Sequence, residues 1–203
     1  MRLRGSRGRG SAAPADWLVV GLGNPGTRYA ATRHNIGFEV ASLLADRWDL
    51  PKAKKKFNGL ITEGRTGPGG PRVAVLLPQT FMNESGTSVG PARGSLGVPL
   101  DHVVVLHDEL DIPFGEVRTR LGGGSAGHNG LKSLTQQLGG PGFHRIRIGV
   151  GRPDSTDPQI VSSFVLGRFA ESKSQVVELI EAAARAAEDL MIRSGDSAGT
   201  ELS

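Results

Sequence analysis

The sequence has no cysteine, one tyrosine and two tryptophans, and no apolar run long enough to cross a bilayer. Without cysteine the chain cannot form disulfide bonds, use a thiolate nucleophile or bind metal through sulfur. Hydrophobic residues make up 37% and charged residues 22% of the 203 residues, an ordinary composition for a soluble globular protein. We therefore expect one domain around one hydrophobic core, in the reducing environment of the cytoplasm.

Positive charge is concentrated at the start of the chain. The formal net charge is +4, and four arginines within the first nine residues account for all of it. Residues 1–16 are rich in arginine, glycine, serine and alanine without apolar periodicity, which predicts a disordered tail whose role the sequence does not reveal. We place the folded domain at residues 17–193 and expect residues 194–203 to fray.

The apolar pattern predicts strands that alternate with helices. Four apolar, β-branched runs indicate buried strands, at Trp17 to Leu22, Val73 to Leu77, Val103 to His107 and Arg145 to Val150. Apolar residues at steps of three and four predict helices over about His34 to Trp48 and Glu171 to Arg193. The segment from Gly64 to Pro71 is typical of a tight turn between two short strands. Together these features predict an α/β sandwich around a mixed, largely parallel sheet.

Two glycine-rich motifs match known signatures only in part. Gly21, Gly23 and Gly26 fit the G-x-G-x-x-G dinucleotide fingerprint, but no acidic residue ends a second strand about 20 residues later. Residues 123–127 fit the G-x-S-x-G of serine hydrolases, but no acid lies between Ser125 and the next histidine. We interpret the second motif as a flexible glycine loop. A dinucleotide-dependent enzyme is the weaker alternative, and we expect NAD and NADP not to raise the melting temperature.

Histidines and acids supply the candidate chemistry. His34 lies in a polar stretch before a predicted helix, and His107 and Asp108 end a buried strand, where α/β folds place functional side chains. We expect His102 and His144 to be structural. The acids that follow this strand could alternatively bind a divalent cation, namely Asp108, Glu109, Asp111 and Glu116. No second acidic cluster completes such a shell, so we expect no metal.

Four blocks of sequence carry a family resemblance: VVGLGNPGTRYAATRHNIGF, PQTFMNESG, HDELDIPFGEVRTRLGGGSAGHNGLKS and FHRIRIGVGRP. In order and spacing they resemble bacterial-type peptidyl-tRNA hydrolase, over about Trp17 to Met191. The resemblance implies a single-domain α/β/α sandwich and an enzyme that hydrolyses the ester bond of peptidyl-tRNA, releasing free tRNA and peptide. It also implies a role in recycling tRNA from stalled or dropped-off translation products. We accordingly expect tRNA as the partner, no cofactor, a cytoplasmic location and a monomer.

The resemblance assigns roles residue by residue. It makes His34 the catalytic histidine and Asp108 the acid that supports it. Three asparagines would hold the substrate around the scissile ester, namely Asn24, Asn83 and Asn129. Residues near the peptide and the tRNA 3′ end would be Tyr29, Phe81 and Met82. The acceptor stem and 5′ phosphate would meet a basic region of Arg118, Arg120, Lys132 and Arg147. The arginine-rich extension before Trp17 is outside the family pattern.

These residue types suit ester hydrolysis. A histidine with a pKa of about 6.5 is mostly neutral near neutral pH and can take a proton from water. Asp108 would fix its tautomer and stabilise the imidazolium that forms. One amide, Asn24 in our hypothesis, would donate a hydrogen bond to the oxygen that gains charge, although the sequence does not decide between the asparagines. A non-catalytic RNA-binding protein of the same fold is the other alternative, and absence of His34 or Asp108 would indicate it.

Overall fold

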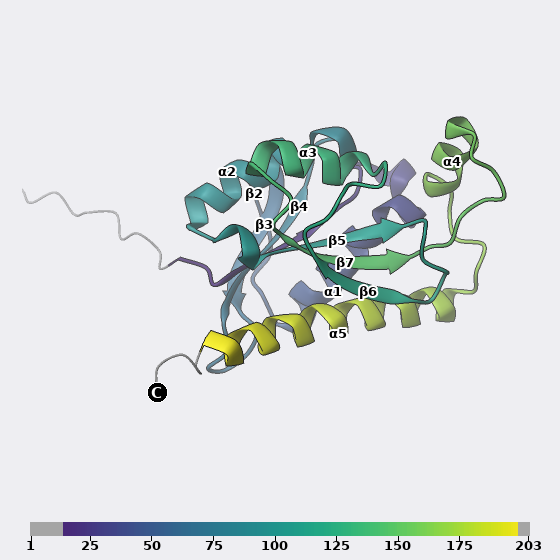
Figure 1. Ribbon diagram of the computed structural model, residues 1–203. Helices are drawn as coiled ribbons and strands as arrows, with labels where there is room; N and C mark the ends of the chain where they lie inside the picture. Colours follow the sequence, from purple (N-terminus) through teal and green to yellow (C-terminus); the bar gives the residue numbers. More distant parts are fainter. Residues whose placement is uncertain (1–13, 199–203) are drawn as a thin grey trace, which may run out of the picture.

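A mixed sheet forms the centre of the computed structural model, which describes residues 14–198 (Figure 1). Within these residues the strand order is β2-β3-β4-β1-β5-β7-β6. The strands are β1 Trp17–Gly21, β2 Lys54–Lys56, β3 Gly59–Arg65, β4 Arg72–Pro78, β5 Val103–Glu109, β6 Val117–Leu121 and β7 His144–Gly149. Strands β4, β1, β5 and β7 run parallel, and antiparallel pairs complete both edges. The predicted mixed, largely parallel sheet is confirmed.

Helices cover both faces of the sheet (Figure 1). The α-helices are α1 Ile36–Arg47, α2 Gly86–Leu96, α3 Asn129–Leu138, α4 Pro158–Val165 and α5 Lys173–Ala198. Short 3₁₀ turns add η1 Thr27–Tyr29, η2 Arg33–Asn35, η3 Met82–Glu84 and η4 Leu100–His102. Helices α1 and α5 pack on one face and α2 and α3 on the other, which is the expected α/β/α sandwich. Helix α4 lies away from both layers, at the end of the sheet.

Alternation along the central strands explains why they are apolar throughout. In β1, Val19 belongs to the core beneath α1 and α5, whereas Leu18 and Val20 belong to the core beneath α2 and α3. All five residues of β1 are buried, and so are all seven of β5. Because a strand that is covered on both faces has no solvent side, its apolar run is continuous rather than alternating.

Two predicted boundaries are wrong. Ala15 is buried, and the N–H of Asp16 donates to the carbonyl of Arg72, so both residues belong to the folded domain rather than to the tail. Helix α5 continues to Ala198, past the expected end at Arg193. Gly195 follows the predicted end, but one glycine destabilises a helix by only about 1 kcal/mol relative to alanine, which does not end a helix of this length. The remaining parts of the predicted tails, 1–13 and 199–203, lie outside the described residues.

Glycine at two positions brings α1 close to the ends of the central strands. A side chain on Gly37 would overlap the backbone oxygens of Leu106 and Leu22, and one on Gly21 would overlap the backbone of Gly37. The first turn of α1 therefore lies directly against the ends of β1 and β5. The turn η2, which precedes α1, is held beside the carboxyl end of β5 as a result.

The first glycine motif begins at Gly21, the last residue of β1, and continues into a loop, whereas the second lies in a loop, as interpreted from the sequence. The G-x-G-x-x-G segment leads into the three-residue turn η1, and the first α-helix begins only at Ile36. No helix N-terminus therefore meets a pyrophosphate there. Ser125 lies in the loop between the exposed strand β6 and α3, where Gly122, Gly123 and Gly127 have positive φ. This is the predicted glycine loop and not a nucleophile elbow.

No helix among residues 14–198 combines the length and apolar character that a membrane span requires.

Candidate active site

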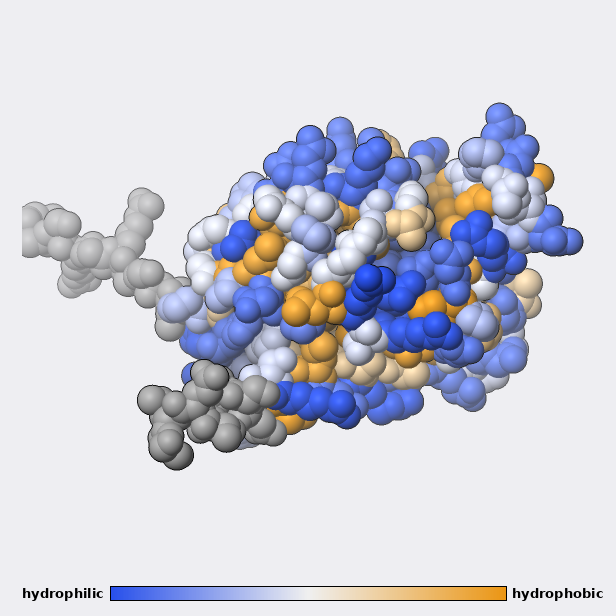
Figure 2. Space-filling view, viewed as in Figure 1, coloured by the Kyte–Doolittle hydropathy of each residue, from blue (hydrophilic) through white to orange (hydrophobic). Residues whose placement is uncertain are grey.

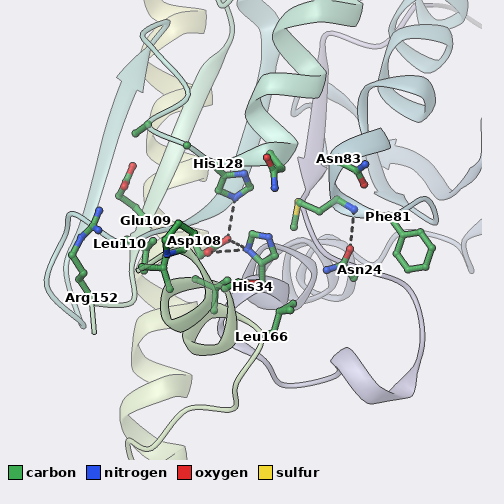
Figure 3. A pocket seen from close by; sticks show the side chains of 18 of the residues that line it. Asn24, His34, Phe81, Asn83, Asp108, Glu109, Leu110, His128, Arg152 and Leu166 are labelled. Atoms are coloured by element: carbon green, nitrogen blue, oxygen red, sulfur yellow. Dashed lines mark hydrogen bonds and ion pairs between the residues drawn. The ribbon is translucent and has the colours of Figure 1, made fainter. Parts of the chain in front are cut away.

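A pocket of about 750 Å³ lies beyond the carboxyl ends of β1 and β5. Its walls come from the loop after β1, η2, η3, the end of β5, the glycine loop and α4 (Figure 3). Seven of the residues assigned from sequence line it together: Asn24, His34, Phe81, Met82, Asn83, Asp108 and Asn129. Segments far apart in the chain thus meet at the edge of the sheet where parallel α/β folds place their ligands.

His34 and Asp108 form the central pair of the pocket. The Nδ1 of His34 lies 2.9 Å from Oδ1 and 3.0 Å from Oδ2 of Asp108. A carboxylate can only accept, so Nδ1 carries the proton and Nε2 keeps its lone pair. No hydrogen bond among residues 14–198 engages that Nε2. The arrangement leaves one basic nitrogen available in the pocket.

Burial and charge act in opposite directions on this pair. Burial by itself lowers the pKa of His34, but the charge of Asp108 and the hydrogen bond to it outweigh burial and raise the pKa above its usual value. Burial by itself raises the pKa of Asp108, whereas His34 and His128 hold it well below its usual value. Asp108 is therefore ionised at every pH at which the protein would work, and it favours the imidazolium of His34.

His128 is the residue of the site that the sequence interpretation missed. It is the N-cap of α3, and its Nδ1 accepts from the N–H groups of Gly130 at 3.1 Å and Leu131 at 3.4 Å. Because Nδ1 accepts, the proton of the neutral ring is on Nε2, which donates to Oδ1 of Asp108 at 3.1 Å. Figure 3 shows both histidines pointing toward the carboxylate. The sequence signal that was available is a polar residue in GHNG, directly before the residues that form α3.

These hydrogen bonds make His128 a poor metal ligand. His34, Asp108 and His128 are the group of three among the described residues whose ligand atoms lie close enough to surround a cation. A metal on Nε2 of His128 would leave the ring with no proton on either nitrogen, since Nδ1 already accepts from backbone N–H groups. The geometry favours protons, rather than a metal ion, between these three side chains.

The four acids that the sequence offers for a metal site have separate partners in the structure. Arg147 pairs with Glu109 at 3.0 Å, Arg152 with Asp111 at 2.7 Å and Arg118 with Glu116 at 2.7 Å. Asp108 faces the two histidines. Each acid therefore has its own partner, and the four do not converge on one point.

The three asparagines differ in how firmly they are held. Asn24 is buried, and its Oδ1 accepts from the N–H of Met82 at 2.8 Å. Its backbone forms two hydrogen bonds with the side chain of Asn35, each 2.9 Å long. Since Oδ1 is occupied, the Nδ2 of Asn24 is the group left to donate. Asn83 and Asn129 are exposed at the pocket rim.

The structure does not bring every assigned residue into the pocket. Tyr29 lies in η1, where the Arg28 guanidinium stacks 4.5 Å from its ring and donates to its hydroxyl, and it is not part of the pocket wall. Lys132 is exposed on α3. His102 stacks on Trp17 with ring centres 4.4 Å apart, in keeping with its predicted structural role.

Arginines gather on the β6–β7 edge, beside the pocket. The register places Arg118 opposite Arg147 and Arg120 opposite Arg145, so the two pairs share one face. Figure 2 shows strongly hydrophilic surface over β6. Like charges that face each other across strands are destabilising, and the pairing of Arg118 with Glu116 and of Arg147 with Glu109 offsets part of this repulsion.

Arg145 was not singled out in the sequence and has a different role. It is buried, and it donates to the backbone carbonyls of Gly123 and Gly124 in the glycine loop. Burial, then the charges of Arg120 and Arg147, lower its pKa. Arg145 thus ties the glycine loop to β7.

Comparison with known proteins identifies the family of the chain. The family model described as "Peptidyl-tRNA hydrolase" matches residues 18–202. Peptidyl-tRNA hydrolase of Syntrophotalea carbinolica is 46% identical over 186 residues, 91% of this chain and 95% of the relative. That of Mycolicibacterium smegmatis is 49% identical over 181 residues, 88% of this chain and 92% of the relative. The crystal structure of peptidyl-tRNA hydrolase from Acinetobacter baumannii superimposes with a TM-score of 0.74 at 35% identity, covering 91% of this chain and 96% of that one. This chain belongs to the peptidyl-tRNA hydrolase family.

Proposed function

We propose that this protein hydrolyses the ester bond of peptidyl-tRNA with a water molecule that His34 activates. The observation that carries the mechanism is the double contact between Nδ1 of His34 and the buried carboxylate of Asp108, at 2.9 and 3.0 Å. It fixes the tautomer in which Nε2 is the base. The raised pKa of His34 fits a group that must hold a proton during the reaction.

The reaction follows from the positions of three side chains. Nε2 of His34 takes a proton from water as the water oxygen attacks the ester carbonyl. The carbonyl oxygen gains negative charge, and the free Nδ2 of Asn24 donates a hydrogen bond to it, a contribution of roughly 3 kcal/mol for a typical donor of this kind. The tetrahedral intermediate then collapses, His34 returns its proton to the ribose oxygen, and a peptide with a free carboxyl group and a tRNA are released.

The surroundings of the base support two binding regions. Arg118, Arg120 and Arg147 of the β6–β7 edge would bind the phosphates of the acceptor stem, a contact that depends little on base sequence. Phe81, which is 52% exposed at the pocket, offers a surface on which an unpaired base at the tRNA 3′ end could stack. Asn83 and Asn129 at the rim would bind the substrate around the ester.

The remaining proposals follow the family's role in translation. We place the enzyme in the cytoplasm, acting as a monomer that recycles tRNA from stalled or dropped-off translation products.

The decisive experiment compares wild type with His34→Ala on tRNA that carries an N-acetylated amino acid, with unblocked aminoacyl-tRNA as the second substrate. Wild type should cleave only the blocked substrate, because a site built around the peptide amide rejects a free amine. The variant should be inactive while its melting temperature shows that it is folded. Full activity of folded His34→Ala would discard His34 as the base, and no cleavage by folded wild type would discard the hydrolase activity.

A further inference from the structure

Helix α4 is a pocket wall with little support of its own. It supplies Pro158, Val161, Ser162 and Val165 to the pocket, and Leu166 follows at its end. Of its residues only Val165 is buried. Figure 1 shows it standing away from the helices that cover the sheet, and its main packing partner is η2, the turn that contains His34. Such a short, exposed helix needs a specific anchor to keep one position.

Arg33 provides that anchor from the position next to His34. Its side chain is 7% exposed, and its Nη1 donates to the carbonyl oxygens of Arg168 at 2.6 Å and Phe164 at 3.4 Å. Its Nη2 lies 3.5 Å from Oε2 of Glu171. A cation beside the last carbonyls of a helix is also favoured by the helix dipole.

Ring contacts and backbone pairing add to these hydrogen bonds. The guanidinium lies 4.1 Å from the ring centre of Phe164 and 5.4 Å from that of Phe169, within the range of cation–π attraction. The N–H of Arg33 donates to the carbonyl of Gly167 at 3.0 Å, and Thr32 forms an isolated β-bridge with Arg168. The segment after α4 is therefore joined to η2 by both backbone and side chain.

We propose that Arg33 is a positioning residue that holds the α4 wall at a fixed distance from His34 and so shapes the part of the pocket that receives the peptide. The proposal rests on the function proposed above, in which His34 is the base. Arg33 does not contact the reacting atoms. Its guanidinium donates to the carbonyls of Phe164, in the last turn of α4, and of Arg168, just after α4, so it acts on the substrate only through that helix.

The kinetic test uses full-length Arg33→Gln and Arg33→Lys with two substrates, N-acetyl-aminoacyl-tRNA and a tRNA bearing a tetrapeptide. Loss of hydrogen bonds from a charged donor is expected to raise KM of Arg33→Gln about tenfold for the tetrapeptide substrate. Its kcat should stay within about twofold of wild type, and the pH midpoint of kcat should be unchanged. Only binding that is equal in the ground state and the transition state is lost, and the base is untouched. Arg33→Lys keeps the positive charge but loses the planar guanidinium with its several N–H donors, and it should give an intermediate KM.

The matched control is Arg47→Gln, which removes another arginine that joins two helices. Arg47 contacts Glu181 and Glu188 of α5, none of the three lines the pocket, and its loss should leave both KM values unchanged. A fall in kcat with a shifted pH midpoint in Arg33→Gln would overturn the proposal, because Arg33 would then act on His34 itself.

Amide hydrogen exchange gives a readout that does not depend on activity. In Arg33→Gln the amides of residues 158–165 should exchange about tenfold faster than in wild type, with those of α1 unchanged. If Arg33→Gln does not fold, the same comparison is made with Arg33→Lys and with Phe164→Leu. Unchanged exchange in a folded variant overturns the proposal. Wild type that cleaves no substrate overturns the proposed function instead, and exchange still decides the role of Arg33.

Discussion

The Nε2–H of His128 donates to Oδ1 of Asp108 across 3.1 Å, so the carboxylate that orients His34 is itself held by a second imidazole. His128 is in turn fixed by the N–H groups at the start of α3. The two histidines approach with ring centres 5.0 Å apart. Asp108 is thus positioned from the helix as well as from its own strand.

Removing this second donor should change the pH profile as well as the rate. In His128→Ala, Asp108 loses one of the groups that lower its pKa, and the more basic carboxylate should attract the proton of His34 more strongly. Activity rises with pH as His34 loses its proton, so the midpoint of kcat should move to higher pH. We expect kcat at neutral pH to fall about tenfold. A rate loss with an unchanged midpoint would mean that His128 only supports the helix, and His144→Ala is the control.

Asn24 can be tested for two separate roles. Asn24→Asp keeps an oxygen that accepts from the N–H of Met82, but it removes the NH₂ donor. If Nδ2 stabilises the oxyanion, kcat should fall by about 100-fold or more while the melting temperature stays close to that of wild type. Asn24→Ala also removes the acceptor and should in addition lose about 1 to 3 kcal/mol of stability. Asn129→Ala, at the exposed rim, should change KM more than kcat, and an equal fall in kcat would remove the distinction drawn between the two asparagines.

His107 predicts how stability depends on pH. Burial, then the neighbouring His128, lower the pKa of His107 to about 3, and its Nε2 has no partner among the described residues. An unfolded imidazole takes up its proton near pH 6.5, so between pH 6.5 and 3 the unfolded chain binds more protons than the folded one. The contribution of this residue is therefore complete above pH 6.5 and declines as pH falls toward 3.

Urea unfolding at pH 7.5 and 4.5 would measure this effect. Wild type should lose more stability on acidification than His107→Asn, with a difference of about 2 kcal/mol. Asparagine can still donate to the carbonyl of Asp108, which His107 contacts at 2.8 Å, so the backbone contact is retained. Equal losses in the two proteins would show that His107 becomes protonated without unfolding.

The sequence predicts the central parallel strands and the helices α1 and α5, because buried strands and amphipathic helices impose repeating patterns. It does not predict the shorter helices α2, α3 and α4. It also predicts that His34 and Asp108 belong to one site, through strand-end placement and the family resemblance. It does not predict the role of His128, because a histidine that caps a helix looks like any polar residue in a glycine-rich loop. Which nitrogen of each ring carries the proton depends on contacts between segments about 20 to 74 positions apart in the chain. Arg33 is hidden for the same reason, since its partners lie more than 130 residues away.

The arginines of β6 give a prediction about salt. Arg118 and Arg120 are exposed, on the face that they share with Arg147 and Arg145. If each neutralises a phosphate of the acceptor stem, log Kd for tRNA should rise with log salt concentration, and each arginine should contribute about 0.7 to 0.9 to the slope. Arg118→Gln and Arg120→Gln should each weaken binding of labelled tRNA at low salt and reduce the slope by about 0.7 to 0.9.

Fluorescence anisotropy over a series of KCl concentrations would provide these slopes, with Arg185→Gln as the control. Arg185 is exposed on α5 and pairs with Glu181 at 3.6 Å, so its replacement removes the same charge from another part of the surface. The slope depends on the number of phosphates that the protein contacts and neutralises, and not on its total charge. This control should therefore leave the slope unchanged. If all three variants lower the slope equally, the arginines of β6 have no special role, and the affinity for tRNA depends only on the total charge of the protein. A lower slope confined to the β6 variants would place the phosphates beside the pocket that contains His34.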